Sequence, residues 1–269
     1  MTGEAIRFKR FLPDGENSVV VAVDHGEFFG PLDGMNNVPE LVEKLKEADG
    51  ILLAPGMVKH CLKTFTGKAG PTLVVRLNWS TSYAFQWEYN DGITVPIITP
   101  EEALSMGVDI GLASCLLKTK DESTDALNAK QFAKLLLAKR HAGLPLVGEY
   151  YPVHAEKLTR DELHNQVAIA CRVMAEMGAD AVKTFYTGKR FIEITKDIPI
   201  PVLVLGADKM ENELDALQLA YNAVNDGARG VFFGRNVTQA KDPSQFLKAL
   251  KQCVKKGVEP TKAVREAGL

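Results

Sequence analysis

Cysteine is scarce in this chain of 269 residues. The four that occur, Cys61, Cys115, Cys171 and Cys253, are far apart and form no CxxC pair. That spacing favours neither a zinc knuckle nor a redox dithiol. We expect four buried free thiols in a reduced protein.

Long hydrophobic runs and an excess of one charge are also missing. No apolar run approaches the ~20 residues of a membrane span, and residues 1–18 lack the apolar core of a signal peptide. The 32 basic and 34 acidic residues leave a net charge of -2, which offers no bulk attraction for nucleic acid or an anionic membrane. We expect a cytoplasmic, soluble protein that handles a small molecule.

Short apolar runs separated by amphipathic helical patterns are what the chain does contain. Eight runs are candidate strands: SVVVAVD, GILLAP, TLVVRL, VDIGLAS, PLVGEYY, AVKTFY, PVLVLG and GVFFGR. Alternation of strands and helices predicts a parallel sheet, and runs that are apolar throughout are typical of strands covered on both faces. Eight such strands are the number that a closed parallel barrel needs.

The same pattern bears on domain organisation. No GxGxxG follows the first run, where VAVDHGEFFG stands instead, so an open doubly wound sheet is the less favoured alternative. With no linker in sight, we predict a single (β/α)8 TIM barrel over residues 1–269. Residues 1–17, approximately, would be an N-terminal extension, and residues 240–269 a C-terminal helical segment.

Turn and capping residues mark the helix ends. Thr99 followed by Pro100 predicts a helix start, and Gly178 and Gly227 predict C-caps. The segment 78–96 fits the alternation poorly and is either a long loop over the barrel or a local hairpin ending in GITVPIIT. Trp79 and Trp87 within it either shape the pocket or cover it.

Lys183 lies where the sixth run ends. Removal from water favours the neutral form of an amine, which is the form that attacks a carbonyl to make a Schiff base. The alternative is an ordinary surface lysine at a strand end. Because the active site of such a barrel lies at the carboxyl ends of its strands, the neighbouring strand ends should distinguish the two.

Three further polar residues end predicted strands. Asp24 shares parity with Val20 and Ala22, so its carboxylate points into the barrel mouth if those two line the interior; otherwise it caps a turn. Glu149 and Tyr151 are two residues apart and could form a proton-transfer pair on one face. A structural ion pair for Glu149 and rim packing for Tyr151 remain the alternatives.

The seventh and eighth runs end in glycine-containing loops. Gly206-Ala207-Asp208-Lys209 and Gly234-Arg235-Asn236 each lead into a helix, and glycines, helix starts and an arginine favour phosphate. Barrels of this kind often bind phosphate after strands seven and eight. Simple turn chemistry is the alternative.

The histidines allow a metal-dependent lyase as another alternative. His25, His60 and His154 each follow a predicted strand, so three ligands could converge, although no HxH or HxxxH spacing supports this. His141 and His164 are most simply surface or packing residues. Sensitivity to a chelator would test the metal alternative.

Five motifs together resemble a known family. VDHG, EYYP, VKTFYTG, GADK and GARGVFFGRN occur in this order between Val20 and Gln239. They resemble the DhnA-type class I aldolases, which include archaeal-type fructose-bisphosphate aldolase, aminodideoxyheptulosonate synthase and the thiolase that acts on phosphorylated autoinducer-2. VKTFYTG is also similar to the KTSTG lysine motif of deoxyribose-phosphate aldolase.

The resemblance implies roles for individual residues. Lys183 would be the Schiff-base lysine, Asp24 an acid/base or carbinolamine-handling carboxylate, and Tyr151 the general acid/base of carbon–carbon cleavage. The residues expected to contact substrate or its phosphate are His25, Glu149, Gly206, Ala207, Lys209, Gly234 and Arg235.

The same resemblance implies the activity. We expect a class I aldolase of a phosphorylated ketose such as fructose 1,6-bisphosphate, without metal or organic cofactor, in a homo-oligomer. The alternatives are transfer on another phosphorylated carbohydrate, of the heptulosonate synthase or thiolase type, and a non-catalytic barrel that binds a sugar phosphate.

The chain departs from the family pattern at three places. Ala207 replaces a second glycine and Asp208 adds a negative charge beside the expected anion, which weakens phosphate binding. Val153 and His154 follow the proline of EYYP, where an arginine is frequent, and this disfavours a bisphosphate. Glu149 stands where an aromatic or apolar residue is common.

Overall fold

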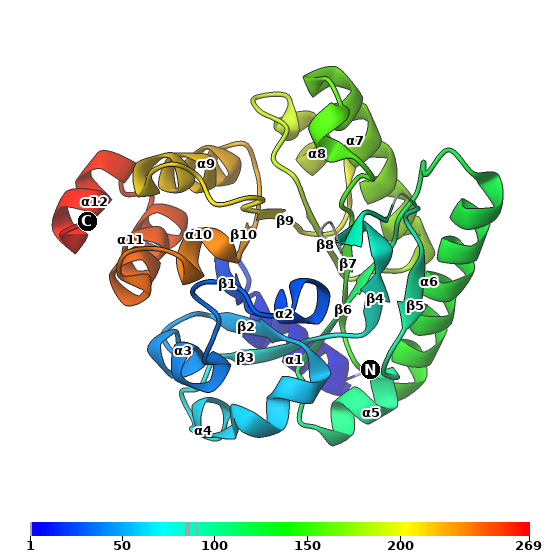
Figure 1. Ribbon diagram of the computed structural model, residues 1–269, viewed down its shortest axis with the longest axis horizontal. Helices are drawn as coiled ribbons and strands as arrows, with labels where there is room; N and C mark the ends of the chain where they lie inside the picture. The colour runs from blue at the N-terminus through cyan, green and yellow to red at the C-terminus, as the bar shows by residue number, and fades with distance from the viewer. Residues whose placement is uncertain (1, 84–86, 90) are drawn as a thin grey trace.

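A closed barrel of eight parallel strands forms the centre of the computed structural model, which describes residues 2–83, 87–89 and 91–269 (Figure 1). Its strands are β1 (Ser18–Ala22), β2 (Gly50–Leu53), β3 (Thr72–Arg76), β6 (Ile110–Ser114), β7 (Leu146–Glu149), β8 (Ala181–Thr184), β9 (Val202–Leu205) and β10 (Gly230–Phe233). Each strand lies within one of the eight apolar runs, in the order β1-β10-β9-β8-β7-β6-β3-β2 around the barrel. The predicted TIM barrel is confirmed.

Both faces of the strands are apolar because both are buried. Val20, Ala22 and Leu52 belong to a cluster inside the barrel, whereas Val21 and Ile51 belong to the cluster between the barrel and its helices. A strand with two buried faces needs no polar positions, and this explains why the runs are continuous rather than alternating.

Helices surround the barrel and follow the strands in turn (Figure 1). They are α2 (Gly26–Phe29), α3 (Val38–Lys44), α4 (Leu62–Phe65), α5 (Pro100–Ser105), α6 (Glu122–Ala142), α7 (Arg160–Met177), α8 (Phe191–Asp197), α9 (Glu213–Asn225) and α10 (Arg235–Thr238). Thr99 forms a capping box with Glu102 at the start of α5, and Gly178 ends α7 in the left-handed conformation. At α9 the C-cap is Asp226 rather than Gly227, which follows it with φ of +96°. The predicted boundary was therefore one residue late.

The two ends of the chain pack on the barrel in different ways. The N-terminal segment contains α1 (Thr2–Phe11), and its Phe11 joins the interior cluster, 6.0 Å from the ring of Phe232 between centroids. This helix closes the amino end of the barrel. The C-terminal helices α11 (Pro243–Lys256) and α12 (Pro260–Ala267) pack on each other and on α9 (Figure 1).

A small antiparallel hairpin lies beside the barrel mouth. Strands β4 (Asn78–Ser80) and β5 (Thr94–Pro96) pair, which confirms the hairpin alternative for this segment. The Asn78 amide donates to the carbonyl of Ser114 and accepts from its N–H, both at 2.8 Å, and so fastens the hairpin to β6. Residues 84–86 and 90, which fall in the same segment, lie outside the described part of the chain.

Two composition-based expectations can be compared with the structure. All four cysteines are free and buried, as expected. Within the described ranges, no helix combines the length and the apolarity that a membrane crossing requires.

Candidate active site

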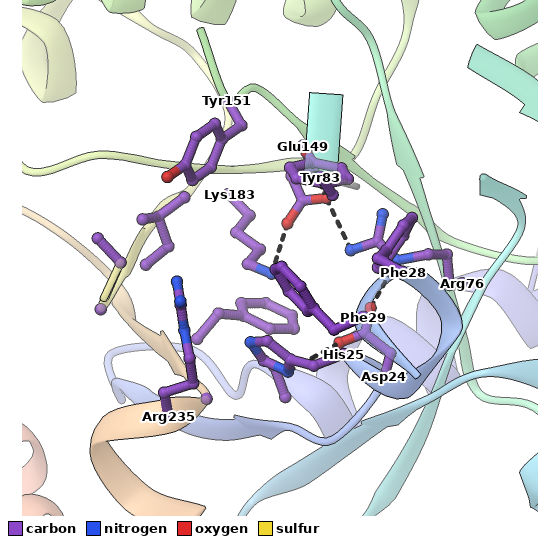
Figure 2. A pocket seen from close by; sticks show the side chains of 16 residues that line it. Asp24, His25, Phe28, Phe29, Arg76, Tyr83, Glu149, Tyr151, Lys183 and Arg235 are labelled. Atoms are coloured by element: carbon purple, nitrogen blue, oxygen red, sulfur yellow. Dashed lines mark hydrogen bonds and ion pairs between the residues drawn. The ribbon is translucent and has the colours of Figure 1, made fainter. Parts of the chain in front are cut away.

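Polar side chains from several strands converge in a cavity at the carboxyl end of the barrel (Figure 2). The polar residues that line it are Asp24, His25, Arg76, Tyr83, Glu149, Tyr151, Lys183 and Arg235. Asp24, Arg76, Glu149 and Lys183 are each at most 6% exposed. Charged side chains are rarely buried unless they are paired with one another. Four of them gathered in one cavity therefore mark it as the candidate site.

Strand register brings the lysine and a carboxylate together. Glu149 of β7 is aligned with Lys183 of β8, and Ser114 of β6 is aligned with Glu149. Residues aligned on adjacent strands present side chains to the same face. As a result the Lys183 Nζ lies 2.5 Å from Oε1 of Glu149, over the ring of Phe232 at 5.2 Å.

The other oxygen of Glu149 is fully engaged. Its Oε2 receives contacts from Arg76 Nη2 at 2.8 Å and from the hydroxyls of Tyr83 and Ser114, each at 2.9 Å. Burial raises the pKa of Glu149, but the charges of Arg76 and Lys183 outweigh it and hold this pKa well below the usual carboxyl range. Glu149 is therefore an ionised carboxylate in a fixed orientation.

Arg76 connects this group to Asp24. Its Nε lies 2.5 Å from Oδ2 of Asp24, and its guanidinium lies 5.0 Å from the ring centroid of Phe28. Burial raises the pKa of Asp24, yet Arg76 and then Lys183 lower it to a net value below normal. The two buried cations, Arg76 and Lys183, are thus paired with two buried carboxylates, and the four charges balance.

His25 is a neutral group at the edge of the cavity. Burial lowers its pKa to about 4, an effect that Asp24 opposes and that Lys183 and Arg235 reinforce. Its Nδ1 has no hydrogen-bond partner in the described residues and lies 3.8 Å from Oδ1 of Asp24. A Cβ at Gly234 would lie 2.2 Å from Cε1 of His25, so this close approach needs a glycine.

Tyr151 and Asp24 lie on opposite sides of Lys183 (Figure 2). Its ring packs edge-on against Phe185 and Tyr83, with centroids 4.7 and 5.4 Å apart. Burial raises the pKa of Tyr151 to about 12, and the charge of Asp208 adds to this effect. The phenol therefore carries its proton at neutral pH.

The two glycine-containing loops meet on the remaining side. Gly206, Ala207, Gly234 and Arg235 all line the cavity, and Ala207 has a left-handed backbone with φ of +51°. The Arg235 Nη2 lies 2.6 Å from Oδ1 of Asp208, whereas its Nε is buried and has no partner in the described residues. Lys209, also expected to contact substrate, is not among the lining residues.

The Asn236 side chain holds these loops together. It donates to the carbonyls of Gly206 and Asp208 at 2.8 and 3.0 Å, and it accepts from the N–H of Met210. This amide is fully buried, so it fixes both backbones where an anion would meet them.

The three histidines considered as metal ligands do not converge. His60 is exposed, and His154 lies 3.5 Å from Glu156 outside this cavity, so His25 alone lines it. In residues 2–83, 87–89 and 91–269, no cluster of three His, Cys, Asp or Glu side chains could hold a metal ion. His164 is buried and contacts Thr187 at 2.9 Å, which agrees with a packing role.

Sequence reasoning missed part of this site. Arg76 lies at the end of the third strand, with the parity of the interior residue Val74, but it was given no role in the predicted site. Tyr83 gave no such indication, since it lies in the segment that fits no strand or helix pattern. Trp79 donates from Nε1 to the carbonyl of Glu27 and does not line the cavity, and Trp87 is 58% exposed.

Comparisons with known proteins extend over almost the whole chain. The model of the family described as DeoC/LacD family aldolase matches residues 18–240. An uncharacterised aldolase of Saccharolobus solfataricus is 28% identical over 272 residues, which cover 98% of this chain and 99% of that protein. A 3-hydroxy-5-phosphonooxypentane-2,4-dione thiolase of Klebsiella pneumoniae is 28% identical over 254 residues, covering 94% and 81% respectively.

Solved structures show the same similarity. A Schiff base forming fructose-1,6-bisphosphate aldolase is 29% identical, with a TM-score of 0.79 over 93% of this chain and 99% of that one. The family match over residues 18–240 spans all eight barrel strands and all five motifs. The resemblance to class I aldolases that these motifs predicted is thereby confirmed.

Proposed function

This chain belongs to the DeoC/LacD family of aldolases, and from that premise we propose that it is a class I aldolase whose amine is Lys183. Its substrate would be a phosphorylated ketose, and fructose 1,6-bisphosphate and a ketose monophosphate are the first two to try. The observation that carries this proposal is a lysine that is 6% exposed, ion-paired with Glu149, and accompanied in one cavity by Asp24 and Tyr151.

Schiff-base formation begins with loss of a proton from the Lys183 ammonium. Oε1 of Glu149 is positioned to accept it, at 2.5 Å from Nζ. The neutral amine then adds to the ketone carbon to form a carbinolamine. Its hydroxyl leaves as water with the proton that Glu149 accepted, Asp24 assisting, and the iminium remains. The iminium is a fixed positive charge beside the carbon where the electron pair develops, so it stabilises the transition state more than the ground state.

Tyr151 suits the proton transfer at the aldehyde. In the synthesis direction, the enamine carbon attacks the aldehyde carbon while the phenol donates its proton to the aldehyde oxygen. Cleavage is the reverse: the C–C electron pair moves to the iminium, and the hydroxyl proton passes to the phenolate form of Tyr151. The phenol then gives this proton to the enamine carbon, which regenerates the phenolate. A phenol pKa of about 12 supports the acid role, because the group is protonated before the synthetic step.

The phosphate of the ketose would bind at the two glycine-containing loops. Backbone near Gly206 and Gly234 can approach an anion closely, and Arg235 supplies a cation whose Nε has no partner among the described residues. Asp208 competes with the phosphate for this arginine.

A second candidate is acyl or aldol transfer on another phosphorylated carbohydrate. The similarity to the Klebsiella pneumoniae thiolase favours it, at an identity close to that of the aldolase structure. Lys183 and the phosphate loops would serve both reactions, so assays should include a transfer substrate.

The activity assay compares wild type with two lysine variants. Lys183→Met should abolish cleavage of the ketose phosphate, whereas Lys189→Met, at an exposed lysine in the loop that follows β8, should retain it. EDTA should leave the rate unchanged. Full activity in Lys183→Met, or loss of activity with EDTA, would contradict the Schiff-base proposal.

A further inference from the structure

A second cavity adjoins the candidate active site. Tyr151 and Ala207 line both cavities, so the two meet at the phenol. Residues that line only the second cavity include Val153, His154 and Glu156, which lie in the loop after β7. Because Tyr151 would exchange its proton with the aldehyde oxygen, the rest of the aldehyde fragment must extend beyond Tyr151 and into this second cavity.

The charges that line the second cavity are negative. Asp91, Glu156 and Asp208 contribute three carboxylates, and no lysine or arginine lines it in the part of the chain that the structure describes. His154 also lines this cavity, and its ring lies 3.5 Å from Glu156. The negative field reaches the reacting group, since Asp208 and Glu156 both raise the pKa of Tyr151.

The first cavity is positively charged where Arg235 lines it, beside the two glycine-containing loops. Arg235 lines the first cavity and not the second, and its guanidinium lies 5.8 Å from the ring centroid of Phe29. The other two cations of the first cavity, Arg76 and Lys183, are already held by buried carboxylates. Arg235 would therefore hold one phosphate, and the described residues that line the second cavity offer no lysine or arginine to a second one.

We propose that the second cavity receives an uncharged, hydroxyl-bearing aldehyde, so that the substrate is a ketose with one phosphate, at its ketone end. This rests on the proposed function and deepens it. Val153, Leu163 and Phe185 offer an apolar wall, and Tyr89 and His154 offer polar groups for hydroxyls. The three carboxylates act against a phosphorylated aldehyde, because specificity can be built by repelling the wrong ligand.

The test measures aldol addition of dihydroxyacetone phosphate to two acceptors. Wild type should use D-glyceraldehyde with a kcat/KM at least roughly tenfold higher than D-glyceraldehyde 3-phosphate, because the doubly charged group meets three carboxylates. High salt should lower this ratio, since it screens the repulsion between the carboxylates and the phosphate. The double variant Asp91→Asn/Glu156→Gln should shift the ratio toward the phosphorylated aldehyde, while Glu176→Gln, an exposed carboxylate on α7, should not.

A preference of the wild type for D-glyceraldehyde 3-phosphate, or a ratio that the double variant does not change, would overturn the inference. Borohydride trapping of dihydroxyacetone phosphate on Lys183 in the same preparation separates the two proposals. An adduct with the wrong acceptor preference removes this inference and leaves the proposed function intact. If no adduct forms on Lys183, whichever acceptor is present, both the proposed function and this inference are wrong.

Discussion

Glu149 is the residue on which the behaviour of Lys183 depends. One of its oxygens pairs with Nζ of Lys183 and the other receives Arg76, so a single side chain orients the amine and compensates a buried guanidinium. Neutralising it leaves both buried cations without this partner.

Glu149→Gln should lower kcat by about 10²-fold or more, as expected for removal of a positioned proton acceptor. It should also destabilise the fold by about 3–5 kcal/mol, because one member of a buried ion-pair group is lost. Steady-state kinetics and urea unfolding check the two effects. Tyr83→Phe removes one hydrogen bond to the same carboxylate and should have a smaller effect on both, so equal effects would contradict the assignment.

Asp208 competes with the anion that Arg235 would hold. Its side chain is 80% exposed and lies 2.6 Å from Nη2 of Arg235. Because an exposed pair is worth little, Asp208→Asn should tighten the inhibition constant for inorganic phosphate by roughly 2–5-fold. Competitive inhibition of the aldol reaction gives this constant. Arg235→Gln should weaken it, and an unchanged constant in both variants would argue against a phosphate site here.

The short helix α2 carries Glu27, a carboxyl group that is largely buried beside the site. Burial raises the pKa of Glu27 to about 8, with Asp24 adding to the effect and Arg76 opposing it. Oε2 of Glu27 is buried and has no hydrogen-bond partner within the described residues. The folded protein therefore holds this proton more tightly than the unfolded chain, whose carboxyl has a pKa near 4.5.

The stability that Glu27 contributes should depend on pH in a defined direction. It is complete below pH 4.5 and is lost as the pH rises through 8, because the unfolded chain ionises first. Urea unfolding of wild type and Glu27→Gln at several pH values, from about pH 5 to about pH 9, measures how the free energy of unfolding of each protein changes with pH. The variant should lose less stability over this range, and identical pH profiles would contradict the raised pKa.

The helix α1 closes the amino end of the barrel, opposite the site. Phe11 is fully buried there and contacts Phe8 and Phe232. Phe11→Ala should therefore cost about 3–5 kcal/mol of unfolding free energy through lost burial and a cavity. Its kcat/KM should stay close to wild type below the unfolding transition. A loss of activity in fully folded Phe11→Ala would show that the two ends of the barrel are coupled.

For the whole molecule, the barrel was predictable because its strands are buried on both faces and its helices carry local end signals. Thr99 and Gly178 mark ends through their own side chain or backbone, so they can be identified without tertiary information. The pairing of β4 with β5 depends on contacts with β6 and α6, such as that of Thr94 with Asn128. No local sequence pattern reveals such contacts. For this reason the sequence could not distinguish a loop from a hairpin in the segment 78–96.

The site was predictable to the extent that it follows strand ends and parity. Asp24, Glu149 and Lys183 were identified in this way, since consecutive strands of a barrel present their last residues to one mouth. The bridge that Arg76 makes between the two carboxylates was not, because it depends on how far a long side chain reaches across the barrel. The contact of Tyr83 with Glu149 joins residues separated by 66 positions and has no counterpart in any motif.

The most direct measurement of the central claim is the site of covalent attachment. The protein is incubated with dihydroxyacetone phosphate, reduced with borohydride, digested and mapped by mass spectrometry, with Lys183→Met and Lys189→Met treated in parallel. The account predicts one reduced adduct, on Lys183, in wild type and Lys189→Met and none in Lys183→Met. An adduct on another lysine, or none in wild type, would contradict it.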